Sequence, residues 1–336
     1  MDGNDLSPEA NELTPQPVAY KDRATGLIIF GILTILLGCV AGLFVPLMLF
    51  GQMATAKATN VPVNFSAILP ALFIYVVLAV ALVWLGIGSI TARRWARALL
   101  LIFSWSWLII GVVSLIFMGI LMPKILANIP TAGTNGKPAL PSAAMNMVMV
   151  VMFLTLGVLY VILPAIWTFF YNSRHVKFTC EARDPVMRWT DTCPLPVLAI
   201  CLWSLISVPM MLIMPLVGHG VIPFFGIFLT GVPGTLFYLA IAAIWGYAGW
   251  SLYKLEQRGW WIILIAACLT MVSSILTFAR NDLTEMYHLM GYPQAQIEQI
   301  QKMGLFTGNR MGWLMSLCML PFLGYLLFIR KYLRRF

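Results

Sequence analysis

The chain has 336 residues, of which 61% are hydrophobic and only 10% are charged, and its formal net charge is +9 at pH 7. Soluble proteins carry about 25% charged residues, so this composition excludes an ordinary soluble domain. No polar segment reaches the roughly 40 residues that an independently folding unit needs without disulfides or metal.

Residues 1–23 are polar and proline-rich and carry Asp2, Asp5, Glu9 and Glu12. Such a segment buries too little apolar surface to fold alone, so we predict a disordered tail. It lacks the basic start and apolar centre of a secretory signal peptide. We therefore expect the first apolar stretch to be an uncleaved membrane anchor.

Eight apolar stretches follow, and none has an Asp, Glu, Lys or Arg in its interior. A helix needs about 20 apolar residues to cross about 30 Å of hydrocarbon. The sequence therefore predicts an all-α, polytopic membrane bundle of eight transmembrane helices. Because ionisable groups at membrane depth mark pumps and coupled-ion sites, their absence here argues against an ion-coupled pump. The expected spans are residues 27–50, 67–90, 98–122, 146–170, 196–217, 233–252, 260–279 and 311–329.

The 21 lysines and arginines fall unevenly on the two sides of this topology. Eight crossings put both termini on one side, and that side receives fifteen of these residues against six on the other. The positive-inside rule then places both termini in the cytoplasm. The positive net charge is thus explained by orientation in the membrane and by contact with anionic lipid. It does not indicate nucleic-acid binding, which would need a folded basic module.

The two halves share a pattern. Pro70 precedes Tyr75 in the second stretch, and Pro233 precedes Tyr238 in the sixth; a basic turn and a tryptophan follow each stretch, at an offset of 163–165 residues. This recurrence favours a parallel four-plus-four duplication. The alternative is that prolines, glycines and interfacial tryptophans recur in any membrane bundle. The predicted domains are the tail (1–23), a bundle (24–330) with halves 24–171 and 196–330, a cytoplasmic loop (172–195) and a basic tail (331–336).

Three segments on the outer side do not read as spans. Residues 218–232 are apolar but broken by glycine and proline, and we predict an interfacial or re-entrant segment. The outer loop 123–145 is expected to be irregular. The outer loop 281–310 is expected to hold two short helices, the first capped by Asp282.

The loop 172–195 is the segment richest in chemically reactive side chains. His175, Cys180 and Cys193 are weak candidates for a zinc site, since structural zinc sites usually pair cysteines two to four residues apart and these stand thirteen apart. A salt-bridged connector is the stronger interpretation. We therefore predict no metal and no cofactor; the three histidines lie outside the spans, which disfavours membrane haem.

Tryptophans and basic residues gather near the expected cytoplasmic ends of the spans. Such aromatic belts are mostly anchors. A second interpretation is a lipid headgroup site after the second span, with a counterpart in the other half. Its candidate residues are Arg93, Arg94, Trp95 and Arg97, with Arg258, Trp260 and Trp261 in the second half.

Two stretches carry a resemblance. They are Gly86-Ile87-Gly88-Ser89 leading to Arg93-Arg94-Trp95-Ala96-Arg97, and Arg188-Trp189-Thr190-Asp191 leading to Cys193-Pro194-Leu195-Pro196. The chain resembles, through these, uncharacterised multi-pass inner-membrane proteins of bacteria. That resemblance implies a bacterial cytoplasmic membrane and no particular activity.

Three classes of function remain open. The first is an integral membrane protein that binds or moves a neutral or lipidic molecule. The second is a non-catalytic scaffold or accessory subunit that contacts a protein partner, or another copy, through the outer loops 123–145 and 281–310. The third, an enzyme, is disfavoured because no known catalytic motif is present.

Overall fold

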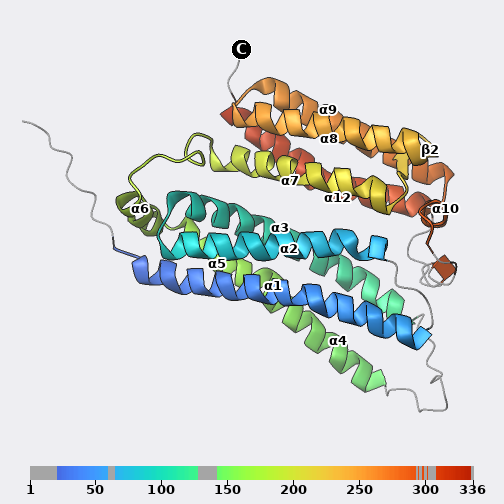
Figure 1. Ribbon diagram of the computed structural model, residues 1–336, viewed down its shortest axis with the longest axis horizontal. Helices are drawn as coiled ribbons and strands as arrows, with labels where there is room; N and C mark the ends of the chain where they lie inside the picture. Colours follow the sequence, from blue (N-terminus) through green and yellow to red (C-terminus); the bar gives the residue numbers. More distant parts are fainter. Residues whose placement is uncertain are drawn as a thin grey trace, which may run out of the picture.

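The computed structural model describes residues 21–59, 65–127, 142–292 and 308–333, together with residues 294, 297, 298 and 301. Nearly all of this part is helical, which confirms the all-α prediction (Figure 1). The predicted tail 1–23 lies outside it up to residue 20. The helices are α1 (Ala24–Thr59), α2 (Phe65–Ile90), α3 (Arg94–Ala127), α4 (Ser142–Gly157), α5 (Leu163–Asn172), α6 (Arg174–Arg183), α7 (Leu195–Val217), α8 (Gly231–Tyr253), α9 (Gln257–Arg280), α10 (Leu283–Leu289) and α12 (Gly308–Ile329).

Seven described helices are long and apolar enough to cross a membrane. They coincide with the first seven predicted spans, and the fourth of them joins α4 to α5 through a π-helical turn, Val158–Ile162. The eighth predicted span, 311–329, lies inside α12 and is helical throughout. The chain is therefore a multi-pass membrane protein by the length and composition of its helices, while the count of eight crossings stays a prediction.

The helices pack as two groups. In the first, α1 pairs with α2 and α3 with α5; in the second, α7 pairs with α8 and α9 with α12. Helix α7 joins the groups by contacting α2 and α3, and Leu195 at its start packs against the hydrophobic cores of both. The order of pairing is thus the same in each half, as a four-plus-four arrangement requires.

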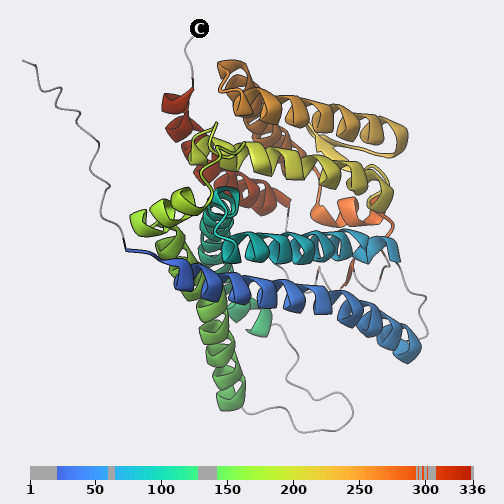
Figure 2. The same cartoon turned by 60° about the vertical axis from the view of Figure 1, so that its left-hand side comes forward.

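Both cores lie at one end of the bundle, which we call the basic end. It holds the turn after α2, helix α6 and residues 184–194 (Figure 1). Away from this end, α1 and α4 diverge from one another (Figure 2). Their apolar side chains are exposed there: Leu43 is 66% exposed on α1 and Leu154 is 65% exposed on α4. Such surfaces suit lipid hydrocarbon, which needs no polar cover.

The turns at the basic end repeat with the same geometry. Ala92 and Leu255 are 163 positions apart, and both adopt a left-handed conformation, with φ of 52° and 62°. Ala92 N–H donates to the Ser89 carbonyl (2.9 Å), as Leu255 N–H does to that of Leu252 (2.8 Å). The next residue in each turn, Arg93 or Glu256, also donates to the residue five positions earlier. This agreement at the sequence offset supports the duplication.

The turn between α4 and α5 has an identifiable cause. Pro164 has no N–H, so it cannot bond to the carbonyl of Tyr160, and the N–H of Leu163 bonds back to Val158 in a wider π turn. Helix α3 approaches at this level, because a Cβ added at Gly111 would overlap the Tyr160 carbonyl oxygen. The bare glycine thus lets α3 lie against the widened turn.

The segment 218–232 folds into a hairpin with no helix of its own before α8. Strands β1 (Ile222–Phe224) and β2 (Ile227–Leu229) pair antiparallel across a turn at Phe225 and Gly226, both with positive φ. The hydroxyl oxygens of Ser273 and Thr277 in α9 accept hydrogen bonds from the backbone N–H groups of Phe225 and Gly226, respectively, at 3.0 Å each. The hairpin is therefore held to α9 by hydroxyl groups that satisfy its backbone, as irregular backbone at a bundle end requires.

The outer loops agree with the sequence in part. Helix α10 follows Asp282, which stands at the N-cap position, although its side chain makes no capping hydrogen bond. Residues 123–127 continue α3 and 142–145 begin α4, while 128–141 and most of 293–307 lie outside the described residues. The second predicted helix of the loop 281–310 therefore falls largely in that undescribed part.

Candidate anion-binding pocket at the basic end

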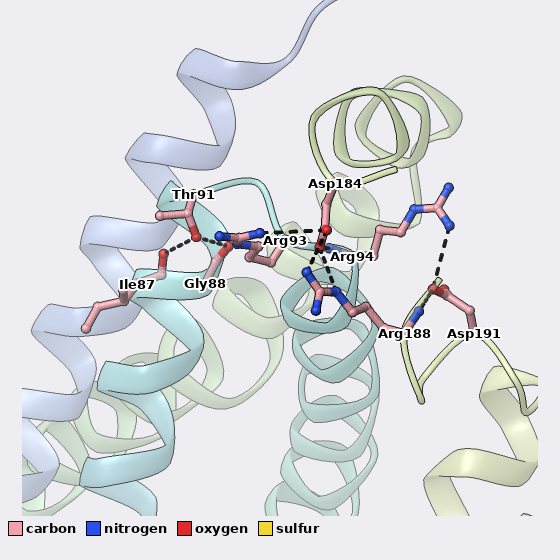
Figure 3. Close-up of polar contacts among 8 residues, drawn as sticks. All are labelled: Ile87, Gly88, Thr91, Arg93, Arg94, Asp184, Arg188 and Asp191. Carbon is pink, nitrogen blue, oxygen red and sulfur yellow. Dashed lines mark hydrogen bonds and ion pairs between the residues drawn. The ribbon is translucent and has the colours of Figure 1, made fainter. Parts of the chain in front are cut away.

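Asp184 organises the connector between the halves. Its side chain is 2% exposed, and its two oxygens accept hydrogen bonds from Arg188, Nη2 at 2.9 Å and Nε at 3.3 Å (Figure 3). It also accepts the Arg94 N–H at 3.4 Å, and Arg93 Nη1 lies 3.7 Å away. Its hydrogen bonds to Arg188, followed by those other donors, lower the pKa of the carboxyl group.

Asp191 ties the same connector to α3 a second time. Its Oδ2 accepts the N–H of Arg188 at 2.9 Å and lies 3.7 Å from Nη1 of Arg94 (Figure 3). At its far side, Tyr253 at the end of α8 donates to the Trp189 carbonyl at 3.0 Å. The segment 184–193 therefore bridges the two halves where their helices end, as the salt-bridged-connector interpretation expects.

Beneath this connector lies a pocket of about 220 Å³. Three elements form its wall: the first turn of α3, one face of α6, and the chain that leads into α7. The lining is mixed in character, with three cations, two carboxylates, two cysteines and a few apolar groups. Its residues are Arg94, Arg97, Ala98, Lys177, Cys180, Glu181, Thr190, Asp191, Cys193, Pro194 and Leu195.

One cation in this lining, Arg97, makes no ion pair with a described residue; burial lowers the pKa of its guanidinium, and the nearby Cys180, Glu181 and Asp191 oppose that shift. Glu181 lies 3.8 Å from Lys177, and Asp191 lies 3.7 Å from Arg94, so each carboxylate already has a partner. Among the residues that the structure describes, no carboxylate is within ion-pair distance of Arg97. Its Nε is buried and makes no hydrogen bond. Because a half-buried guanidinium without a partner is costly, the site favours an anion from outside the chain.

The backbone adds to this preference. Helix α3 begins at Arg94 and α7 begins at Leu195, and both residues line the pocket. Helix N-termini carry a partial positive charge, which favours phosphate and carboxylate. At the start of α3 the Arg94 N–H is already donated to Asp184. The pocket thus combines an arginine that makes no ion pair with the start of α7 and with the start of α3, whose first N–H is held by Asp184.

The structure divides the predicted headgroup residues of the first half. Arg94 and Arg97 line the pocket. The Arg93 guanidinium lies 3.7 Å from Asp184, and its side chain is 45% exposed. The Trp95 ring stacks on Trp84 with ring centroids 4.1 Å apart. Sequence reasoning named the two pocket arginines, but it did not group Lys177, Glu181 and Thr190 with them. The spacing of four residues between Lys177 and Glu181 was the available signal.

The predicted counterpart in the second half is different in kind. Trp260 is only 2% exposed, and its Nε1 donates to the Leu326 carbonyl at 2.7 Å. The expectation that its ring contacts lipid headgroups is therefore wrong, because the ring fastens α9 to α12. Arg258 and Trp261 are exposed, as an interfacial belt requires.

Two of the three weak metal candidates line the pocket, and the third lies apart from it. His175 is exposed, and its Nδ1 accepts the N–H of Lys21 at 3.3 Å. Cys180 and Cys193 both line the pocket, and burial raises the pKa of the Cys180 thiol to about 11, so little of the metal-binding thiolate is present near pH 7. Within the described ranges, no three His, Cys, Asp or Glu side chains are placed to hold a metal ion.

No protein-family model, curated protein or solved structure matches the chain. Functional inference therefore depends on the site alone.

Proposed function

We propose that the protein binds the phosphate group of an anionic membrane lipid in the pocket at the basic end. The observation that supports this most is Arg97, whose guanidinium lines the pocket without a carboxylate partner among the described residues. Phosphate is the anion that a guanidinium and a helix start bind best together. The basic end then faces the cytoplasm of a bacterial cell, as the positive-inside rule suggests.

The predicted duplication provides an internal comparison. Position 97 corresponds to position 260 at the offset of 163 residues that relates the two turns. In the second half this position holds Trp260, which is buried and bonded to α12. The fold can thus fill this place with an aromatic ring. In the first half the corresponding position holds Arg97, which lines a pocket where a buried ring could stand. Anion binding explains why an arginine occupies this position.

A lipid suits the position of the pocket better than a soluble anion does. Two spans begin at its wall, at Arg94 and Leu195, and the ends of spans lie at the depth of lipid phosphates. The Trp84 ring, 51% exposed, stands beside the same turn, and exposed tryptophans favour the interfacial region. Much of both outer loops lies outside the described residues, so the scaffold alternative stays a prediction.

The test compares Arg97→Gln with Arg174→Gln, an equal change of charge at an exposed site on α6. The protein is purified in a mild detergent, and the affinity for a soluble short-chain phosphatidylglycerol is measured together with the co-purified anionic lipid. Loss of charge-assisted hydrogen bonds worth about 1.5–3 kcal/mol predicts a 10- to 100-fold weaker affinity for Arg97→Gln. We expect Arg174→Gln to stay within about twofold, since exposed charges contribute little.

Equal affinities in Arg97→Gln and the unaltered chain would contradict the proposal. Inorganic phosphate serves as a parallel probe. Tight binding of phosphate without preference for the short-chain lipid would assign the pocket to a soluble anion instead.

A further inference from the structure

Unpaired polar atoms gather around the pocket at the basic end. In the part of the chain that the structure describes, four buried side-chain nitrogen or oxygen atoms have no hydrogen-bond partner, and three of them belong to residues of the pocket lining. They are Nε of Arg94, Nε of Arg97 and the hydroxyl oxygen of Thr190. Buried polar groups are nearly always hydrogen-bonded, because leaving one unpaired costs free energy. Three unpaired donors around one pocket point to a ligand with several acceptor oxygens, as a phosphate group has.

Thr190 is the uncharged member of this set. It is 2% exposed and lies in the connector between α6 and α7. A threonine that served packing alone would bond its hydroxyl to a nearby carbonyl, as Thr179 and Thr192 do. The Thr190 hydroxyl makes no such bond within the described chain. It can therefore donate to a ligand oxygen without giving up another partner.

The lining also offers acceptors, which a bare phosphate group cannot use. Glu181 and Asp191 both belong to it, and both lie close enough to interact with the charge of Arg97. Among the described residues Glu181 makes one ion pair, with Lys177 at 3.8 Å, and no hydrogen bond. A partly exposed pair of that kind contributes little to stability, so the carboxylate is free to accept hydrogen bonds from a ligand. The lining thus favours a ligand that carries donors besides its phosphate.

The net charge of the lining indicates which donors fit. Its three basic side chains carry three positive charges and its two carboxylates carry two negative charges, so one positive charge remains. A zwitterionic headgroup such as ethanolamine phosphate would leave that charge unbalanced. A phosphate monoester would bring a second negative charge towards the carboxylates. A phosphodiester with hydroxyl groups on its substituent has both the single charge and the donors.

We propose that the pocket takes the glycerol phosphate headgroup of phosphatidylglycerol. Arg97 and Thr190 donate to its phosphate oxygens, and Glu181 accepts hydrogen bonds from its glycerol hydroxyls. The volume of about 220 Å³ equals that of roughly seven molecules of liquid water, which is more than a phosphate group alone requires. This inference rests on the proposed function, because it names the headgroup that the same site selects.

The first experiment compares headgroups on the unaltered full chain in a mild detergent. The probes are short-chain phosphatidylglycerol, phosphatidic acid and phosphatidylethanolamine, together with glycerophosphoglycerol, which is the same headgroup without acyl chains. We expect phosphatidylglycerol to bind roughly tenfold more tightly than the other two lipids, the ratio that one charge-assisted hydrogen bond supports. Equal affinity for phosphatidic acid would overturn the inference and leave the proposed function in place. Glycerophosphoglycerol that binds as tightly as the lipid would keep the headgroup and overturn the lipid as its source.

The second experiment replaces Thr190 by valine, which keeps the shape of the side chain and removes the hydroxyl. Because that hydroxyl is unpaired in the chain alone, Thr190→Val should be as stable as the unaltered protein in lipid-free micelles, or more stable. Its affinity for phosphatidylglycerol should nevertheless fall roughly three- to tenfold. The control is Thr168→Val, since the Thr168 hydroxyl is buried and bonded to the Pro164 carbonyl. It should lose stability and keep its affinity; unchanged affinity in Thr190→Val would remove Thr190 from the site.

The third experiment tests the acceptor. Glu181→Gln removes the negative charge at nearly constant volume, and Glu285→Gln makes the same change at an exposed position on α10. We expect the preference for phosphatidylglycerol over phosphatidic acid to fall roughly three- to tenfold in Glu181→Gln and to stay constant in Glu285→Gln. Arg97→Gln should weaken both lipids alike. A constant preference in Glu181→Gln overturns the headgroup inference alone, whereas an Arg97→Gln variant that binds both lipids normally overturns the proposed function as well.

Discussion

At the basic end, burial and hydrogen bonds determine the role of single side chains. Asp184 is almost fully covered yet charged, because Arg188 supplies two hydrogen bonds and the Arg94 backbone a third. The sequence placed Asp184 in a salt-bridged connector without showing which carboxylate would be buried. Likewise it ranked Arg97 with Trp260 as equal candidates, although one lines a pocket and the other closes a core. Burial depends on neighbours distant in sequence, which spacing cannot reveal.

We expect Asp184→Asn to loosen the connector. The amide keeps the volume of the side chain but loses the charge that Arg93 and Arg188 share, at a cost of about 1–2 kcal/mol in the free energy of unfolding, the order for hydrogen bonds to a charged group. Asp282→Asn, an exposed change at the opposite end, is the control. Denaturant unfolding in mixed micelles measures both. Equal stability of the two variants would remove Asp184 from this role.

The same residue predicts a pH dependence with a definite sign. Its pKa is lowered in the folded state, so its stabilising contribution is complete above the unfolded value, near 3.9, and is lost as the pH falls through the lower folded value. The difference in stability between the unaltered chain and Asp184→Asn should therefore stay constant from pH 7 to about pH 5 and shrink only below about pH 4. A difference that already shrinks between pH 7 and pH 6 would assign the effect to another group.

At the scale of elements, the apolar runs predicted the spans well because lipid demands uninterrupted helices. The helices extend beyond the runs, as α1 does from Ala24 to Thr59 and α3 from Arg94 to Ala127. Two features were not predictable in form. The hairpin at 222–229 depends on hydroxyls of α9, fifty residues away, and the π turn depends on how Pro164 meets α3.

Gly111 provides a test of that second contact. In Gly111→Ala the new Cβ would meet the Tyr160 carbonyl, a backbone atom that cannot move cheaply, and we expect a loss of roughly 1–3 kcal/mol, the range for overpacking. Gly119 lies on the same helix with no atom within 4 Å of an added Cβ, so Gly119→Ala is the matched control. It should be neutral or gain up to about 1 kcal/mol from helix propensity. A similar response of the two variants would contradict the close approach of α3 to the π turn.

At the scale of the whole molecule, the repeated order of helices and turns accounts for the packed and charged end. Two halves with the same helix order bring their tight turns, at 91–93 and 254–256, to the same end. The connector and the start of α7 then close the space between them. The sequence offset predicted the duplication, which stays a prediction, but the pairing of α7 with α2 and α3 did not follow from it, because contacts between halves leave no periodic pattern.

The orientation of this charged end is the prediction on which the lipid site depends. With eight crossings and an excess of Lys and Arg at the basic end, both termini should lie in the cytoplasm. A fluorescent protein that folds only in the cytoplasm, fused after Phe336, should therefore be bright, while alkaline phosphatase at the same place should be inactive. Fusions in the outer segment 128–141 are the control and should show the opposite pair of results. An active phosphatase after Phe336 would mean either an odd number of crossings or an inverted bundle, and it would place the arginine pocket away from the cytoplasmic leaflet.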